Sequence, residues 1–347
     1  MERQARVLLL IPHLGGGGAE QVMALLARGL SAQKYELHLA VLTGSDTAGV
    51  SLPPNVTVHL LGAPRVRSAA FRLLRLIRRL RPGVVLAGMA HAGFLVLLLK
   101  PLLPRSTRLL IRQNGTASAA IASGQVPRYT RLLYRWLYPR ADCVICQSSA
   151  MARDLLGFIR IAPERVIVLP NPIDLEAIAA AAAAPSSWTG PGPHLLAVGR
   201  LAEEKGFDLL LEAFKTVRER HPQADLLIAG EGPLRDRLQV LARDLGLAAT
   251  VRFAGYVDRP QLLFPGATLF VLSSRHEGMP NALLEASAAG LPLAATPASG
   301  GVVDLVGRMP GAWLAADLAA GSLASTLLTA LAAIEPGQRF VRPVFNP

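Results

Sequence analysis

Short apolar runs alternate with stretches of helical spacing along most of this chain. Runs of this kind occupy residues 6–11, 35–43, 194–199, 225–230, 250–255, 268–273 and 291–296. They are too short for buried helices and are typical of strands that are covered on both faces. Strands that alternate with helices form parallel sheets. The pattern therefore predicts an α/β protein built on doubly wound parallel sheets.

The length of the chain and its turn-forming segments predict two domains. A chain of 347 residues exceeds what one hydrophobic core usually supports. Pro170 and Pro172 stiffen the segment 166–174, as expected of a hinge between two rigid bodies. An alanine-rich stretch and a connector rich in Pro, Gly and Ser follow. We expect domains at 1–170 and 194–347, joined by a crossover and linker at 171–193.

The stretch around two glutamates carries the strongest functional signal. Glu277 follows a predicted strand, whereas Glu285 lies in a helix that Pro280 opens and Gly290 closes. Ligands of open α/β sheets bind where the strands end. A helix N-terminus suits phosphate, and carboxylates accept hydrogen bonds from sugar hydroxyls. The two together favour a nucleotide sugar as the ligand; the alternative is an exposed acidic loop before an ordinary helix.

Two further loops offer groups that suit phosphate. Arg200 and Lys205 flank a strand-to-helix turn of the second domain, where a guanidinium and an ammonium group can clamp a diphosphate. In the first domain, the glycines at 15–18 form another such turn, which lets backbone approach a phosphate closely. Their spacing lacks the complete G-x-G-x-x-G of dinucleotide-binding proteins. A solvated basic loop and a tight turn without a chemical role are the simpler alternatives.

These motifs resemble those of the retaining glycosyltransferases of the GT-B class, family 4. The resemblance rests first on Glu277, the segment 278–281 and Glu285, and it extends over most of the chain. It implies two Rossmann-like parallel-sheet domains that face each other across a cleft. It also implies transfer of a sugar from a nucleoside diphosphate to an acceptor with retention of the anomeric configuration.

The same resemblance implies roles for single residues. Glu277 would hold the transferred sugar and Glu285 the ribose, while Arg200 and Lys205 would neutralise charge on the leaving diphosphate. His91 would contact the sugar or the acceptor; the alternative is a packed or capping histidine. The segment 111–115 ends another strand and would line the same cleft. Further donor contacts are implied for Gly17, Gly18, Gly278, Met279, Pro280, Asn281, Ala282, Tyr256 and Val257.

The positive charge is concentrated in the first half of the chain. Residues 1–170 carry 22 Lys and Arg against 7 Asp and Glu, whereas residues 171–347 carry 14 against 17. Residues 65–81 combine helical spacing of apolar residues with several arginines, which is typical of helices that bind a membrane surface. The alternative is a helix packed on its own sheet with a solvated basic face. Nucleic acid is not expected as a partner, because stacking aromatics do not accompany the basic residues.

The remaining apolar features favour a cytoplasmic protein that lies on the inner face of the membrane. No signal peptide is apparent, and the apolar stretch 84–99 is too short and too interrupted to span a bilayer. The two cysteines, Cys143 and Cys146, fall three positions apart in a predicted strand. Such positions point to opposite faces, so we expect thiols of the core rather than a redox pair.

The remaining expectations concern the donor, the acceptor and the reaction. No Asp-x-Asp motif lies in a suitable loop, so we expect a metal-independent enzyme without a cofactor, using a UDP-sugar as its donor. The acceptor would be a glycan or a lipid-linked saccharide of cell-surface polysaccharide assembly. Family members usually end with a helix that crosses back onto the first domain. In this chain we expect that helix to be shortened or absent after the predicted helix at 317–334. A nucleotide-sugar epimerase or isomerase of the same fold and a catalytically silent binding protein are the alternatives.

Overall fold

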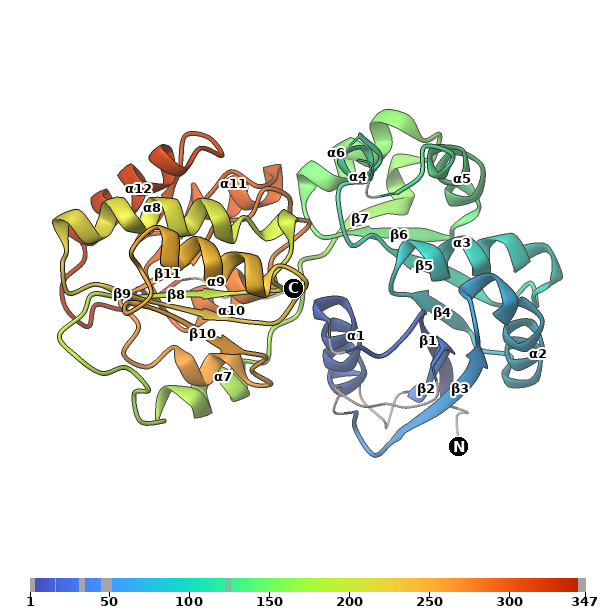
Figure 1. Cartoon of the computed structure of the whole chain (residues 1–347). Helices are drawn as coiled ribbons and strands as arrows, with labels where there is room; N and C mark the ends of the chain where they lie inside the picture. Colours follow the sequence, from blue (N-terminus) through green and yellow to red (C-terminus); the bar gives the residue numbers. More distant parts are fainter. Residues whose placement is uncertain are drawn as a thin grey trace. The chain divides into compact units, whose positions relative to one another are not determined.

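The computed structural model describes residues 4–15, 17–30, 35–44, 52–122, 124 and 126–342. The chain divides into two compact units, Met1–Pro172 and Ile173–Pro347. Each unit is built on one parallel sheet with helices on its faces (Figure 1). This confirms the predicted α/β architecture with two parallel-sheet domains.

The sheet of the first unit has the strand order β3-β2-β1-β4-β5-β6-β7. Its strands are β1 (Ala5–Ile11), β2 (Tyr35–Thr43), β3 (Val56–Ala63), β4 (Val84–Ala87), β5 (Arg108–Arg112), β6 (Cys143–Cys146) and β7 (Val166–Val168). The order reverses between β1 and β4, which pair in parallel from Val7 opposite Val84. A crevice forms beyond the carboxyl ends of the strands at such a reversal.

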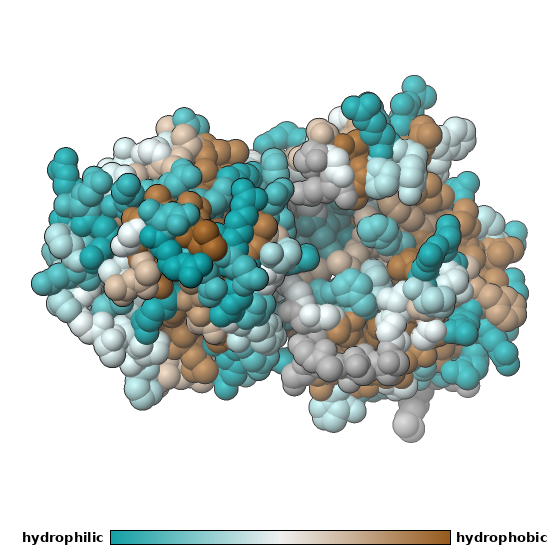
Figure 2. Space-filling view, viewed as in Figure 1, coloured by the Kyte–Doolittle hydropathy of each residue, from teal (hydrophilic) through white to brown (hydrophobic). Residues whose placement is uncertain are grey.

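Helices follow most of these strands. They are α1 (Gly18–Gly29), α2 (Ala70–Leu80), α3 (Ala90–Leu99), α4 (Ala117–Ala122), α5 (Thr130–Leu137) and α6 (Ser149–Phe158). The surface of this unit is mixed, and hydrophobic side chains gather over the region of α3 and α5 (Figure 2). Leu73, Leu76 and Ile77 of α2 are buried in the core of the unit itself, whereas Phe71 is 75% exposed. Packing on its own sheet therefore accounts for the buried stripe of α2.

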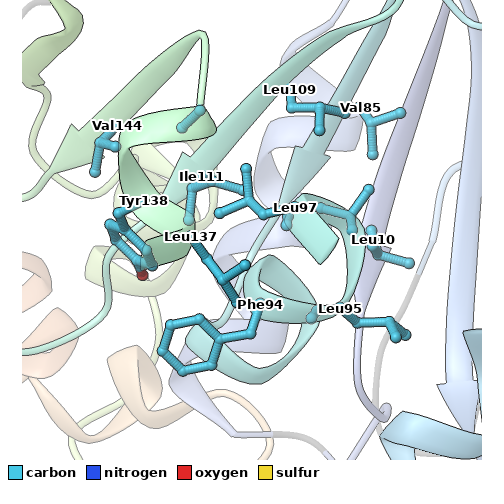
Figure 3. Packing of buried hydrophobic residues seen from close by; sticks show 14 of the residues in the cluster. Leu10, Val85, Phe94, Leu95, Leu97, Leu109, Ile111, Leu137, Tyr138 and Val144 are labelled. Carbon is cyan, nitrogen blue, oxygen red and sulfur yellow. The ribbon is translucent and has the colours of Figure 1, made fainter. Parts of the chain in front are cut away.

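Alternate residues of β1 reach two separate hydrophobic clusters. Leu10 packs on one face with Phe94, Leu97 and Tyr138 (Figure 3), whereas Leu9 and Ile11 pack on the other face with Met23. This is the two-residue period of a strand covered on both sides. A parallel sheet of this kind needs the near-continuous apolar runs that the sequence displays.

The two cysteines lie on opposite faces of β6, as predicted. Cys146 is in the cluster around Leu10, whereas Cys143 packs against the cluster around Leu9, and both thiols are free. Burial raises the pKa of Cys143, and burial with nearby acidic groups raises the pKa of Cys146 to about 12. Both thiols are therefore inert at neutral pH.

The sheet of the second unit has the order β10-β9-β8-β11-β12-β13. Its strands are β8 (His194–Val198), β9 (Asp225–Ala229), β10 (Val251–Gly255), β11 (Leu269–Leu272), β12 (Leu293–Ala295) and β13 (Ala312–Leu314). Its helices are α7 (Leu175–Ala182), α8 (Phe207–Arg220), α9 (Arg235–Asp244), α10 (Asn281–Ala288), α11 (Gly300–Val306) and α12 (Ala320–Ala333). The strand order reverses between β8 and β11, which places the loops after these two strands at one crevice.

The segment after α12 packs on the second unit as far as residue 342. The backbone N–H of Phe340 donates to the carbonyl oxygen of Gly290 at 2.8 Å. The guanidinium of Arg342 is 7% exposed and donates to the carbonyl oxygens of Pro310, Leu291 and Gly311. Within the described residues, this segment contains no helix after α12.

Candidate active site

Glu277 and Lys205 form a close ion pair at the carboxyl edge of the second sheet. Lys205 Nζ lies 2.6 Å from Glu277 Oε1, and the hydroxyl of Ser274 donates to the same oxygen at 2.7 Å. The Glu277 side chain is only 8% exposed, whereas that of Lys205 is 24% exposed. These partners offset the solvation that a carboxylate loses on burial. The loops after β8 and β11 are thereby joined, although the two residues are 72 positions apart.

Close backbone packing brings Lys205 to this position. A 3₁₀ turn, Glu203–Lys205, ends at Gly206, which adopts φ +59° and starts α8. A Cβ atom on Gly206 would overlap the carbonyl oxygen of Ser273. The hydroxyl of Ser273 in turn donates to the carbonyl oxygen of Lys205 at 2.9 Å. Glycine is required here both by the left-handed backbone and by the close approach of the loop after β11.

The side chain of Arg275 also links the loop after β11 to the loop after β8 and the start of α8. Its guanidinium donates to both carboxylate oxygens of Asp208 at 2.7 Å each and to the carbonyl oxygen of Glu203 at 3.1 Å. Burial alone would raise the pKa of Asp208, but the hydrogen bonds and charge of Arg275 outweigh it and lower that pKa. The sequence reasoning did not single out this pair, because its members are 67 residues apart.

Arg200 lies in the loop after β8 with its side chain exposed. Among the described residues, nothing forms a hydrogen bond or an ion pair with its guanidinium. Gly230 comes so close to this loop that a Cβ atom there would overlap the carbonyl oxygen of Gly199. The exposed guanidinium is therefore free to bind an anion beside the end of β8.

Glu285 lies on α10 with a strongly perturbed carboxyl group. Burial, and secondly the negative charge of Asp174, raise the pKa of Glu285 to about 7. Asp174 is held in place as the cap of α7, where its side chain accepts from the backbone N–H of Ala177 at 2.9 Å. The structure thus places Glu285 where it is half-protonated near neutral pH, a property that is common in binding and catalytic groups.

The other predicted donor contacts of the second unit lie on loops and helix starts at the same edge of the sheet. Gly278 and Met279 precede the capping residue Pro280, and α10 begins at Asn281 and Ala282. Tyr256, which is 55% exposed, and Val257 follow β10, the first strand in the sheet order. The predicted residues of this unit therefore all lie in the loops that follow β8, β10 and β11 or on α10.

In the first unit, the glycine turn packs against the buried side chain of Glu20. Gly17 caps α1, which begins at Gly18, and a Cβ atom on Gly17 would lie 2.7 Å from Glu20 Oε2. Glu20 is 4% exposed and its carboxylate lies 2.9 Å from His13 Nδ1. Gly16 lies outside the described residues. The close approach at Gly17 thus accommodates Glu20, a residue that the sequence reasoning did not single out.

His91 and the segment 111–115 both follow strands of the first sheet. His91 is exposed on the first turn of α3, after β4. Beyond β5, Arg112 is 3% exposed and donates to Asn114 Oδ1 at 2.7 Å and to Asn171 Oδ1. Burial lowers the pKa of Arg112 to about 10.

Gln147 adds a buried amide at the neighbouring end of β6. Its Oε1 is buried without a hydrogen-bond partner among the described residues, and its Nε2 donates to Asn114 Oδ1 at 3.5 Å. A buried acceptor without a donor is costly. The carboxyl edge of the first sheet therefore gathers amide groups that a polyhydroxyl ligand could satisfy.

In the described part of the chain, no group of three or more His, Cys, Asp or Glu side chains is arranged to hold a metal ion. No helix among those residues is long and apolar enough to cross a membrane.

Two protein families match the two units. Residues 16–177 match the glycosyltransferase family 4 and residues 183–340 match the glycosyl transferases group 1. The solved structure of Anabaena HepE in complex with UDP has the same fold, with a TM-score of 0.74 at 18% identity over 94% of this chain and 90% of that chain. Two doubly wound parallel sheets in this arrangement of strands define a GT-B glycosyltransferase fold.

Two curated relatives cover most of the chain. The lipopolysaccharide core biosynthesis glycosyltransferase LpsE of Rhizobium meliloti is 30% identical, over 83% of this chain and 78% of the relative. The N-acetylgalactosamine-N,N'-diacetylbacillosaminyl-diphospho-undecaprenol 4-alpha-N-acetylgalactosaminyltransferase of Campylobacter jejuni is 27% identical, over 86% and 82%. The chain belongs to the group 1, family 4 glycosyltransferases, as the resemblance of its motifs predicted, and it is a glycosyltransferase.

Proposed function

We propose that this protein transfers a sugar from a UDP-sugar to a lipid-linked saccharide, with retention of the anomeric configuration and without a metal ion. The observation that carries the proposal is the pairing of Lys205 with the buried Glu277, with the exposed guanidinium of Arg200 on the same loop after β8. A cation, an acid and a helix start at one end of a parallel sheet are the groups that a sugar diphosphate needs.

The donor would lie along the carboxyl edge of the second sheet. Arg200 and Lys205 would bind the diphosphate, and the positive end of the dipole of α10 would add to this positive field. Glu285 would accept hydrogen bonds from the ribose hydroxyls, and Glu277 from the hydroxyls of the transferred sugar. The backbone around Tyr256 and Val257 would contact the base.

Catalysis would come mainly from charge stabilisation on the leaving group. The bond between the anomeric carbon and the diphosphate oxygen breaks, and the same carbon bonds to the acceptor oxygen on the same face. The acceptor hydroxyl gives up its proton, which the departing diphosphate can take. Donors that are already in place for the developing negative charge are each worth about 2.7–4 kcal/mol. Lys205 and Arg200 would supply this charge in place of a divalent ion.

Donor and acceptor are inferred from the relatives. HepE of similar fold was solved with UDP, and the Campylobacter relative is named for a diphospho-undecaprenol substrate. A lipid-linked acceptor places the enzyme at a membrane surface, which agrees with the excess of 22 Lys and Arg over 7 Asp and Glu in residues 1–170. We propose that it works on the cytoplasmic face, in the assembly of cell-surface glycans.

A transfer assay tests the proposal. The protein is incubated without added metal, in the presence of EDTA, with a panel of UDP-, GDP- and ADP-sugars and a membrane lipid extract. We expect a glycolipid product only with UDP-sugars, and an α linkage by NMR when the donor is α. Conversion of the donor to another nucleotide sugar in the absence of acceptor would indicate an epimerase instead. Binding of UDP-sugars without any conversion would indicate a silent binding protein.

The raised pKa of Glu285 predicts pH-dependent UDP binding. The ionised carboxylate is the better acceptor for ribose hydroxyls, so the dissociation constant should rise roughly threefold to tenfold as the pH falls from 8 to 6. Calorimetric titration with UDP at several pH values measures this dissociation constant. The second ionisation of the diphosphate, with a pKa near 6, affects wild type and Glu285→Gln alike. A pH dependence as steep in Glu285→Gln as in wild type would refute the role of Glu285.

The same raised pKa predicts the effect of Glu285 on stability. Because the folded state binds the proton more tightly than the unfolded state, this group stabilises the fold at low pH, and that stability is lost as the pH rises towards 7. Above pH 7 the buried charge remains a net cost of about 1–3 kcal/mol. Glu285→Gln should therefore be more stable than wild type at pH 8 and closer to it at pH 5. Urea unfolding at the two pH values checks this, and a loss of stability at pH 8 would contradict it.

A further inference from the structure

The exposed face of α5 carries a row of apolar side chains. Tyr129, which caps the helix, is 64% exposed, Leu132 is 56% exposed and Trp136 is 72% exposed. Their spacing of three and four residues places them on one stripe of the helix. Large apolar side chains that share a stripe and face solvent usually mark a binding surface.

A row of arginines runs beside the apolar row. Arg128, Arg131 and Arg135 each precede one of the apolar residues and are exposed as well. Residues 47–141 contain 15 Lys and Arg and no Asp or Glu. The surface around α5 therefore offers apolar contact and positive charge, with no acid from this stretch of the chain to repel an anionic partner.

The residues on the opposite face of α5 are buried, so the apolar row and the arginine row both face solvent. Tyr134 and Leu137 are buried in the core of the first unit, and the rings of Tyr134 and Phe94 meet edge to face at 5.0 Å. The helix cannot roll to bury its outer row without withdrawing these residues. The neighbouring helix α3 and the turn after it also carry exposed apolar residues, namely Leu98, 59% exposed, and Leu102, 51% exposed.

We propose that this face of α5, defined by Tyr129, Leu132, Trp136 and the three arginines, docks on an anionic lipid bilayer. Trp and Tyr side chains favour the interface between headgroups and acyl chains, and leucine favours the acyl chains. The arginines bind headgroup phosphates. This rests on the proposed action at a membrane and names the surface responsible, which is α5 rather than the buried apolar stripe of α2.

Single-stranded nucleic acid is the other polyanion that aromatics and arginines can bind. At α5, Tyr129 and Trp136 do accompany arginines, contrary to the expectation from the sequence. Leu132 on this face, and the exposed Leu98 of the neighbouring helix α3, have no aromatic ring to stack on bases and favour lipid. We therefore assign the surface to lipid and treat nucleic acid as an outcome of the test.

Co-sedimentation with vesicles tests the assignment. Vesicles of phosphatidylcholine with 30% phosphatidylglycerol should bind the wild type at low ionic strength, and pure phosphatidylcholine should bind it much less. We expect Leu132→Ser/Trp136→Ser to weaken binding roughly tenfold or more. Arg128→Ala/Arg131→Ala/Arg135→Ala should weaken it by about fivefold for each arginine. The matched controls Val240→Ser and Arg237→Ala, at exposed positions of α9, should bind as wild type does.

The fluorescence of Trp136 separates lipid insertion from mere electrostatic attraction. Trp188 is 7% exposed and Trp313 is partly buried, so Trp136 is the exposed tryptophan. Vesicles should shift the emission to shorter wavelength, and lipids brominated near the headgroup end of the acyl chain should quench it. Trp136→Phe should abolish the shift while keeping most of the binding.

Vesicle binding that is unchanged in the α5 variants, or that is lost in Phe71→Ser on α2 instead, would overturn the assignment. Binding of single-stranded RNA that requires Trp136 would assign the surface to nucleic acid. A wild-type dimer that dissociates only in the α5 variants would assign it to a second copy of the chain. Calorimetric titration with UDP is run on every variant. Normal UDP binding with lost vesicle binding supports the docking surface whatever the sugar donor is. Normal vesicle binding by a wild type that transfers no sugar from UDP-sugars would refute the proposed function alone.

Discussion

Lys205→Ala is expected to lower kcat for sugar transfer by roughly 10²–10³-fold. The ammonium group of Lys205 is partly exposed and lies 2.6 Å from Glu277. We place the leaving diphosphate beside it. Loss of one preorganised charge at a leaving group typically costs about 2.7–4 kcal/mol in the transition state. Initial rates at saturating donor measure the effect.

The variant also leaves Glu277 buried without its cation, so a loss of fold must be separated from a loss of catalysis. An unpaired buried charge costs about 3–5 kcal/mol. Lys205→Ala/Glu277→Gln removes both charges and should recover most of the stability in urea unfolding, but little of the activity. Lys215→Ala, at an exposed position further along α8, is the matched control and should keep full activity. Wild-type rates in Lys205→Ala would exclude Lys205 from the active site.

Gly206→Ala should destabilise the protein by about 2–4 kcal/mol and abolish most of its activity. At φ +59°, a Cβ atom is strained by the backbone, and here it would also overlap the carbonyl oxygen of Ser273. Relief of that overlap would push the loop after β11 away from Lys205. Thermal or urea unfolding gives the change in stability, and the transfer assay gives the change in activity.

Gly246→Ala is a control for the backbone contribution alone. Gly246 has φ +75°, but a Cβ atom there would meet no atom within 4 Å. It should cost only about 1 kcal/mol and leave transfer intact. Equal losses of stability in the two variants would show that the contact between Gly206 and Ser273 does not matter.

The strands were predictable from the sequence because their residues face apolar layers on both sides. Leu8 to Leu10 in β1 and Leu269 to Leu272 in β11 are almost fully buried, and the apolar runs report this directly. β3, β7 and β13 were missed because Val56–Ala63, Val166–Val168 and Ala312–Leu314 are partly exposed, so no continuous buried run marks them. Helix bounds differed by a residue or two, as at α10, which begins at Asn281 rather than Pro280.

The polar contacts of the site were less predictable than its location. Glu277 and Lys205 were singled out one at a time, each from its own loop. Their ion pair, and the fork between Arg275 and Asp208, depend on which strands lie side by side. Local sequence does not encode the partner of a side chain 67 residues away. Arg112 lies in the predicted segment 111–115, but its hydrogen bond to Asn171 was missed for the same reason, because Asn171 lies 59 residues further on.

The surface of the first unit was the hardest feature to derive. The helical pattern at 65–81 predicted a membrane-binding helix, and of its apolar residues Leu73, Leu76 and Ile77 face the core, while Phe71 stays exposed. In α5 the apolar residues are divided between two faces, so the exposed row of Leu132 and Trp136 is hidden within an apparently uniform sequence. Periodicity identifies an apolar stripe, and only the packed fold tells which stripe remains exposed.

Calorimetric titration with UDP is the most direct test of the central claim, which is that the loops after β8 and β11 bind the donor diphosphate. We predict one UDP site per wild-type chain, unchanged affinity in Lys215→Ala, and affinity at least tenfold weaker in Arg200→Ala/Lys205→Ala. Wild-type affinity in Arg200→Ala/Lys205→Ala, or no binding of UDP to the folded wild type, would contradict the account.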